Sequence, residues 1–145
     1  MKLYILNGPN LNMLGIREPE IYGGENYSML IDKLRAHCEE LGIEAVFYQS
    51  NHEGCLVDKI HEAYFEGADG IVINPGAYTH TSVALLDAIK ATKLPTVEVH
   101  ISDVSAREDF RQISYIGMAC VKTIAGHGLS GYSEAVDYLY EVLSK

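Results

Sequence analysis

Gly70-Ile71-Val72-Ile73-Asn74-Pro75-Gly76 is the stretch that decides the fold of this chain. It is a short, continuous, β-branched run that ends abruptly in turn-forming residues. A strand of this kind is buried on both faces, as in parallel sheets that carry helices on either side. The stretch therefore indicates a central strand of an α/β sheet, with Asn74 at its carboxyl end.

Four more segments have the same form, in which an apolar strand is followed by a polar cluster. They are Leu3–Leu6, Glu44–Gln49, Thr96–Val99 and Ala119–Ala125. Apolar residues at helical spacing predict four helices between and after the strands. These are Tyr27–Leu41, Leu56–Phe65, Thr79–Ala91 and Ser133–Leu143, the third with Thr79, Thr81 and Ser82 as capping residues.

Alternating strands and helices imply a parallel sheet with helices on both faces, wound by right-handed crossovers. With five strands, we expect a flavodoxin-like three-layer α/β sandwich in which the five-stranded parallel sheet has the order 2-1-3-4-5. The length of 145 residues fits one domain, and no linker or repeat divides the chain. We therefore expect a single domain over residues 1–145.

Charge and composition exclude several classes of partner. The net charge is −9, with 20 acidic against 11 basic residues, which argues against nucleic acid because phosphate backbones need clustered Lys and Arg. A small anion can still be held by a few arginines, and Arg17, Arg107 and Arg111 are candidates. No apolar run reaches the length of a membrane span, and the apolar run at the N-terminus is too short for a signal peptide, so we expect a cytoplasmic protein.

The three cysteines predict neither a disulfide framework nor a metal site. They are odd in number and widely spaced, without a Cys-x-x-Cys pair, so we expect buried free thiols. No metal-ligand cluster of standard spacing appears, which leaves metal-free acid–base chemistry. Asn7–Asn12 matches neither a Walker A nor a Rossmann loop, and Gly128–Gly131 misses the spacing of a hydrolase elbow.

In such a sheet, ligands bind outside the carboxyl ends of the strands. Two long polar connections at that edge, Gly8–Asn26 and Ile101–Gly117, have the composition of active-site lids. In the first, Arg17 lies near Tyr22, and a tyrosine acting as base needs such a cation to favour its anion. The alternative interpretation is a solvated arginine and a surface tyrosine. The polar ends Ser50–His52 and Gly126–Gly128 receive no chemical role.

Two histidines follow neighbouring strands and are candidates for a general acid. His80 and His100 both lie near Asn74 in the expected winding, and Glu98 is placed to fix a histidine tautomer. A solvated or structural histidine is the alternative. Ile101 and Ser102 expose consecutive backbone N–H groups that suit a carboxylate or an oxyanion.

Five motifs, in order and at family spacing, resemble type II 3-dehydroquinate dehydratase. They are Asn7–Asn12, Arg17–Gly23, Gln49–Gly54, Asn74–Ser82 and Glu98–Ser102. The resemblance covers Leu3 to about Tyr138. It implies a hydro-lyase that removes water from 3-dehydroquinate by a metal-free anti elimination through an enolate, giving 3-dehydroshikimate without a cofactor.

The resemblance also implies a role for single residues. Tyr22 would be the base, as tyrosinate, with Arg17 lowering its pKa and helping to close the lid. His100 would be the acid with its tautomer set by Glu98, and Asn10 would orient a water that stabilises the enolate. Substrate would be bound by Asn74, His80, Asp87, Ile101, Ser102 and Arg111, with Asp87 reaching a neighbouring subunit's site.

The family forms dodecamers built from trimers, so the resemblance implies a homo-oligomer of that kind. The chain departs from the family pattern at Asp103 and Ser105, and Asp103 adds a negative charge that Arg107 is placed to neutralise. An alternative from another class is a catalytically silent module that binds a small anion. The joint presence of Tyr22 and His100 argues against it, because binding alone needs no base and acid. The sequence does not distinguish shikimate synthesis from quinate breakdown.

Overall fold

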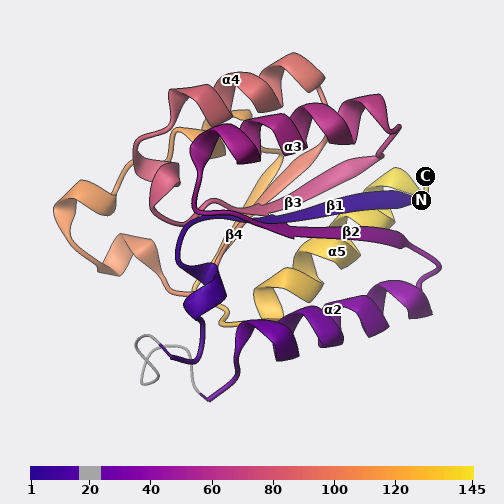
Figure 1. Cartoon of the computed structure of the whole chain (residues 1–145), viewed down its shortest axis with the longest axis horizontal. Coiled ribbons are helices and arrows are strands. Elements are labelled where there is room, and N and C mark those ends of the chain that lie inside the picture. Colours follow the sequence, from indigo (N-terminus) through magenta and orange to yellow (C-terminus); the bar gives the residue numbers. More distant parts are fainter. Residues whose placement is uncertain (17–23) are drawn as a thin grey trace.

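A parallel sheet in the order β2-β1-β3-β4-β5 forms the centre of the computed structural model, which describes residues 1–16 and 24–145. Its strands are β1 (Lys2–Asn7), β2 (Glu44–Gln49), β3 (Gly70–Asn74), β4 (Thr96–His100) and β5 (Lys122–Ala125). The helices are α2 (Tyr27–Glu40), α3 (Glu53–Phe65), α4 (Val83–Thr92) and α5 (Ser130–Leu143). Helices α3 and α4 cover one face and α2 and α5 the other, as Figure 1 shows. The predicted strand order and three-layer α/β architecture are confirmed.

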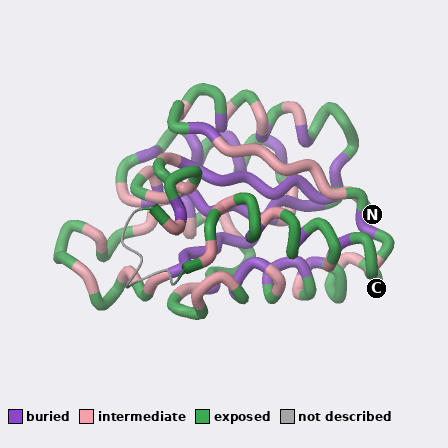
Figure 2. The backbone as a smooth tube through the Cα atoms, turned by 60° about the horizontal axis from the view of Figure 1, so that its bottom comes forward, coloured by how far each residue is buried: buried purple, intermediate pink, exposed green. Residues whose placement is uncertain are grey.

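Alternation along the strands divides the core into two layers. Leu3 and Ile5 of β1 pack in the cluster that includes α2 and α5, whereas Tyr4 and Leu6 pack in the cluster with α3 and α4. Every residue of β3 is buried, which explains its continuous apolar sequence. Figure 2 shows buried chain running through the middle of the molecule and exposed chain on the outer turns.

The carboxyl ends of the strands gather at one end of the molecule, and both chain termini lie at the other (Figure 1). Short 3₁₀ segments follow the strands there: η1 (Leu11–Met13), η2 (Gly76–His80), η3 (Val104–Ala106) and η4 (Asp109–Arg111), whereas η5 (Ile116–Ala119) precedes β5. Asn7 and Asn74 are register partners at the ends of β1 and β3. These neighbouring strands are the point where the strand order reverses, which is where α/β sheets bind ligands.

The predicted helix Thr79–Ala91 is wrong at its start. Gly76–His80 forms the separate segment η2, and α4 begins only at Val83. Ser82 is the N-cap of α4, because its Oγ accepts a hydrogen bond from the backbone N–H of Leu85 at 2.9 Å. Thr79 is therefore no cap, and its side chain is available for the interior.

Smaller differences concern other ends and the cysteines. Strand β5 begins at Lys122 rather than Ala119, because η5 occupies the start of the predicted strand. The three thiols are free, but only Cys38 is buried; Cys120 is half-buried and Cys55 is exposed on α3, so the prediction of buried thiols is wrong for Cys55. In the part of the chain that the structure describes, no helix is long and apolar enough to span a membrane.

Candidate active site

A cavity of about 160 Å³ lies at the carboxyl ends of β1, β3 and β4. Its lining brings together residues that are up to about a hundred positions apart in the sequence. The predicted site residues among them are Asn10, Asn74, His80, His100, Ile101, Ser102 and Arg111. Arg107, a candidate for anion binding, also lines the cavity.

Among the described residues, two other predicted site residues, Asp87 and Glu98, do not line this cavity. Arg17 and Tyr22 lie outside the described residues, so their assignments stay predictions. Asp87 is exposed on α4 and contributes nothing to the cavity of its own chain.

Glu98 and His100 form a buried pair on β4. They are alternate residues of one strand, so their side chains lie on the same face of the sheet. His100 Nε2 lies 2.7 Å from Glu98 Oε2, and the carboxylate itself is 0% exposed. An ionised carboxylate only accepts, so the proton of this hydrogen bond stays on His100 Nε2, which donates to Glu98, and Nδ1 is left for a ligand. This geometry fits the predicted role of Glu98.

Three hydroxyl groups surround the same carboxylate. Thr79 and Ser114 donate to Oε2, the latter at 2.8 Å, and Thr123 donates to Oε1 at 3.0 Å. Burial alone raises the pKa of the Glu98 carboxyl, but the hydrogen bond and charge of His100 and then the hydroxyls of Thr79 and Ser114 outweigh it and hold the pKa at about 2. Glu98 is therefore ionised at neutral pH.

The space beside Glu98 also requires a glycine. A Cβ built on Gly117 would lie 2.9 Å from Glu98 Oε1. Ser114, which donates to the carboxylate, also accepts a hydrogen bond from the Gly117 N–H at 2.9 Å. Sequence reasoning missed Ser114 and Thr123, because isolated hydroxyl residues carry no spacing signal.

The loop that carries Asn10 is held from β2. Asn10 has the left-handed backbone conformation, with φ of 70°, which asparagine tolerates better than most residues. Its N–H donates to Asn51 Oδ1 at 3.0 Å, and Gln49 Nε2 donates to the Gly8 carbonyl at 3.1 Å and to Asn51 Oδ1 at 3.2 Å. The segment Ser50–His52, for which no role was predicted, thus fixes the Asn10 loop.

The amide of Asn74 is fixed at both ends. Its Oδ1 accepts a hydrogen bond from the Gly76 N–H at 3.1 Å, and its Nδ2 donates to the hydroxyl of Tyr132 at 2.8 Å. The Asn74 backbone carbonyl accepts from the Gly8 N–H at 2.7 Å, so the ends of β1 and β3 are joined beside the cavity.

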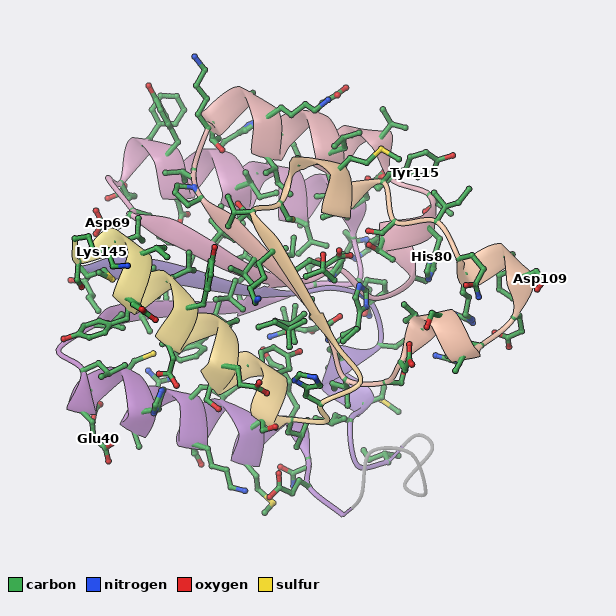
Figure 3. The ribbon with its side chains drawn as sticks, turned by 180° about the vertical axis from the view of Figure 1, so that it is seen from behind. Glu40, Asp69, His80, Asp109, Tyr115 and Lys145 are labelled. Atoms are coloured by element: carbon green, nitrogen blue, oxygen red, sulfur yellow. The ribbon has the colours of Figure 1, made fainter. Side chains whose placement is uncertain are left out.

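His80 and two arginines, Arg107 and Arg111, also line the cavity. Figure 3 shows His80 at the end of the molecule from which the segment around Asp109 projects. His80 Nδ1 donates to the Ile113 carbonyl at 2.7 Å, which leaves Nε2 as the acceptor nitrogen of a neutral ring. Arg111 Nε donates to Glu108 at 2.6 Å, and its remaining N–H groups keep their donor capacity.

The carboxylate of Asp103 accepts hydrogen bonds within its own turn. Its Oδ1 accepts hydrogen bonds from the Ser105 N–H at 3.1 Å and from the Ser105 hydroxyl at 2.5 Å, so Asp103 is the N-cap of η3. Asp103 does not line the cavity, whereas Arg107 does. The aspartate at position 103 therefore adds no carboxylate to the cavity lining, to which Arg107 contributes a positive charge.

The arrangement is suited to acid–base chemistry on a small polar anion. It joins an imidazole on an ionised carboxylate to amide groups, a serine hydroxyl, backbone N–H groups and two arginines. Within residues 1–16 and 24–145, no group of three or more His, Cys, Asp or Glu side chains is placed to hold a metal ion.

Comparison with known proteins gives one consistent family. Residues 1–140 match the family model described as dehydroquinase class II. The chain is 54% identical over 142 residues to the 3-dehydroquinate dehydratase of Caldicellulosiruptor bescii, with 98% of each chain covered. It is 56% identical over 139 residues to that of Corynebacterium glutamicum, covering 95% of this chain and 94% of the relative.

Solved structures agree with the sequence relatives. The type II dehydroquinase from Butyrivibrio crossotus superposes with a TM-score of 0.94 at 54% identity, covering 96% of this chain and 97% of that structure. A 3-dehydroquinate dehydratase-like protein from Bifidobacterium longum superposes with a TM-score of 0.75 at 31% identity, covering 100% and 99%.

Proposed function

The chain belongs to the class II dehydroquinase family and is therefore a hydro-lyase, and we propose that it converts 3-dehydroquinate to 3-dehydroshikimate by a metal-free anti elimination of water through an enolate. The observation that carries this mechanism is the His100–Glu98 pair, a buried imidazole on an ionised carboxylate at the edge of the cavity. Such a pair suits a general acid, which a leaving hydroxyl group requires.

In the first step, Tyr22 as tyrosinate takes a proton from the carbon next to the ring ketone. The electron pair of the broken C–H bond forms the carbon–carbon double bond of the enolate, and the π pair of the carbonyl group moves onto its oxygen. Arg17 favours the tyrosinate by its charge, as nearby cations do for anions. Asn10, on the loop held by Asn51, orients a water toward the enolate oxygen. The family motif supports the assignment of Tyr22 and Arg17.

In the second step, the enolate re-forms the carbonyl group and a carbon–carbon double bond forms as the β-hydroxyl leaves. The leaving oxygen takes the Nδ1 proton of the His100 imidazolium and departs as water. His100 is left neutral with its remaining proton on Nε2, where Glu98 accepts it at 2.7 Å. The tautomer that Glu98 favours is thus the one that the step produces.

The hydroxyls and carboxylate of the substrate bind to the polar lining of the cavity. The residues in this role are Asn74, His80, Ile101, Ser102 and Arg111. The proposal also includes a cytoplasmic dodecamer of four trimers in which Asp87 reaches a neighbouring subunit's site. Its exposure on α4 supports this, since the side chain is accessible to a second copy.

The test is the ultraviolet absorbance of the conjugated enone that forms when purified protein is mixed with 3-dehydroquinate. We expect a steady rise with the wild type and a loss of roughly 10²–10⁴-fold in rate with His100→Gln, the range for a lost general acid. His61→Gln is the matched control, because His61 is exposed on α3 and does not line the cavity. A wild type that binds 3-dehydroquinate without forming enone would instead be a small-anion binding module. Full activity of Tyr22→Phe would overturn the assigned base.

A further inference from the structure

Tyr132 is a buried residue that the proposed mechanism does not use, and its hydroxyl lies between two asparagines at the site. It belongs to α5 and is 0% exposed. Its hydroxyl donates to Asn7 Oδ1 at 2.6 Å and accepts from Asn74 Nδ2 at 2.8 Å. One tyrosine from the last helix thus joins the ends of β1 and β3, where the cavity begins.

The backbone fixes where this hydroxyl lies. Asn7 and Asn74 are register partners on adjacent parallel strands, so their side chains lie on the same face of the sheet. That face is covered by α5, and the ring of Tyr132 packs in the same apolar cluster as Leu3 and Ile5. Close packing leaves the ring little room to move, so the hydroxyl is a fixed point beside Asn74.

The direction of each hydrogen bond follows from the donors available. Asn7 Oδ1 can only accept, so the Tyr132 proton points to Asn7 and a lone pair of the hydroxyl faces Asn74 Nδ2. Asn74 Oδ1 meanwhile accepts from the Gly76 N–H. Rotating the Asn74 amide by 180° would break both of its hydrogen bonds. The cavity therefore meets Asn74 in one orientation, with the second Nδ2–H and one Oδ1 lone pair left for a ligand.

Among the described residues, the side-chain amide of Asn7 depends mainly on its hydrogen bond from Tyr132. Its Nδ2 is buried and makes no hydrogen bond of normal geometry with any described residue. Burial raises the pKa of Tyr27, and the Asn7 amide lowers it by a smaller amount. Without the Tyr132 hydroxyl, both polar atoms of the Asn7 amide would lack a firm partner, a costly state for a buried group.

We propose that Tyr132 is a positioning residue for the substrate, acting through Asn74. Its hydroxyl, itself directed by Asn7, fixes the amide orientation that Asn74 presents to a hydroxyl group of the bound molecule. The inference rests on the proposed function, because it takes Asn74 as a binding residue for 3-dehydroquinate. Tyr132 touches no reacting atom, and its effect is on binding.

The test compares Tyr132→Phe with the wild type in the enone assay. Phenylalanine keeps the ring and removes only the hydroxyl. We expect kcat/KM to fall about tenfold, mainly through KM, because the amide binds substrate and transition state alike. Tyr4→Phe is the matched control. Tyr4 is also buried and donates a hydrogen bond, to Glu62 at 2.9 Å, but it packs on the opposite face of the sheet. We expect its kinetic constants to stay within about twofold of the wild type, since it does not touch Asn74.

A double-mutant cycle separates positioning from general loss of stability. In an Asn74→Ala background, Tyr132→Phe should change KM by less than about twofold, because the group it orients is gone. The same tenfold loss in both backgrounds overturns the inference. Asn7→Leu provides a second variant that leaves the tyrosine in place should Tyr132→Phe fail to fold, and its KM should rise in the same direction.

The outcomes distinguish this inference from the proposed function. Suppose that the wild type forms enone and that KM is unchanged in Tyr132→Phe. This result overturns the role of Tyr132 and leaves the function standing. If only Asn7→Leu folds, an unchanged KM in that variant has the same meaning. A folded wild type that forms no enone overturns the function and the inference together.

Discussion

Replacing Glu98 by glutamine removes one buried charge at the site while keeping its shape. The Gln oxygen can take the place of Oε2, which accepts from His100, Thr79 and Ser114, and the amide nitrogen can take that of Oε1, where the Thr123 hydroxyl can turn to accept. The packing and most hydrogen bonds survive, so the difference between the two proteins reports mainly the charge.

The pKa of Glu98 sets the size of the effect. In the folded protein it is about 2, against an ordinary value of 4.5. At about 1.4 kcal/mol per pH unit, this difference corresponds to about 3 kcal/mol in favour of the ionised form. Because the folded-state pKa is lowered, the stabilisation is fully present above pH 4.5 and is lost as the pH falls toward 2. Between pH 5 and pH 3 the loss amounts to about 2 kcal/mol.

The assay is urea unfolding of the wild type and Glu98→Gln at one protein concentration across this pH range. Other carboxylates titrate in both proteins, so the difference between the two free energies of unfolding isolates Glu98. We expect a wild-type advantage of about 3 kcal/mol at pH 7 that shrinks by about 2 kcal/mol between pH 5 and pH 3. The enone assay should show a loss of roughly 10²-fold or more, since a neutral amide no longer stabilises the imidazolium form of His100 that protonates the leaving group. A free-energy difference that stays constant from pH 7 to pH 3 would refute the reasoning.

Three further predictions concern packing, capping and thiol access. Gly8→Ala should lower the free energy of unfolding by about 1–3 kcal/mol in urea titrations, because its Cβ would lie 2.4 Å from the backbone oxygen of Pro75; unchanged stability would contradict the close approach. Ser82→Ala should cost about 1 kcal/mol as a lost N-cap while kcat/KM stays within about twofold, and a large kinetic effect would argue against a purely structural role. Native protein should react with a thiol reagent at Cys55 alone, because burial raises the pKa of the other two thiols to about 11 and 12; equal reaction of all three would disprove this.

The fold followed from local patterns because a parallel α/β sheet leaves few alternatives. Continuous β-branched runs such as Gly70–Asn74 identify strands buried on both faces, and right-handed crossovers then restrict the strand order. The predicted start of α4 at Thr79 was wrong because tertiary contacts hold Thr79 elsewhere. The backbone carbonyl of Thr79 accepts from the Tyr115 N–H at 2.8 Å and its hydroxyl is bound to Glu98. These contacts hold Thr79 outside the helix that its spacing suggested.

The cavity lining was predictable to the extent that its residues follow strands. Asn74 and His100 end β3 and β4, so the topology alone brings them to one edge. Ser114 and Asn51 were missed, because a single hydroxyl or amide on a loop has no sequence signal until the loop is placed. Arg17 and Tyr22 remain predictions, because they lie outside the described residues.

The missed residues share a physical role, which is to fix the orientation of groups that the topology had already placed. Strand ends set a position to within the reach of a side chain, but they do not set which way an amide or an imidazole ring is turned. That choice depends on hydrogen bonds with residues far along the chain, such as the one that Asn74 donates to Tyr132 and the one that Ser114 donates to Glu98. A site that delivers a proton needs both the position and the orientation of its groups to be fixed, since catalysis depends on the reacting atoms being held in one geometry. Variants of the orienting residues should therefore change kinetic constants while leaving the fold intact.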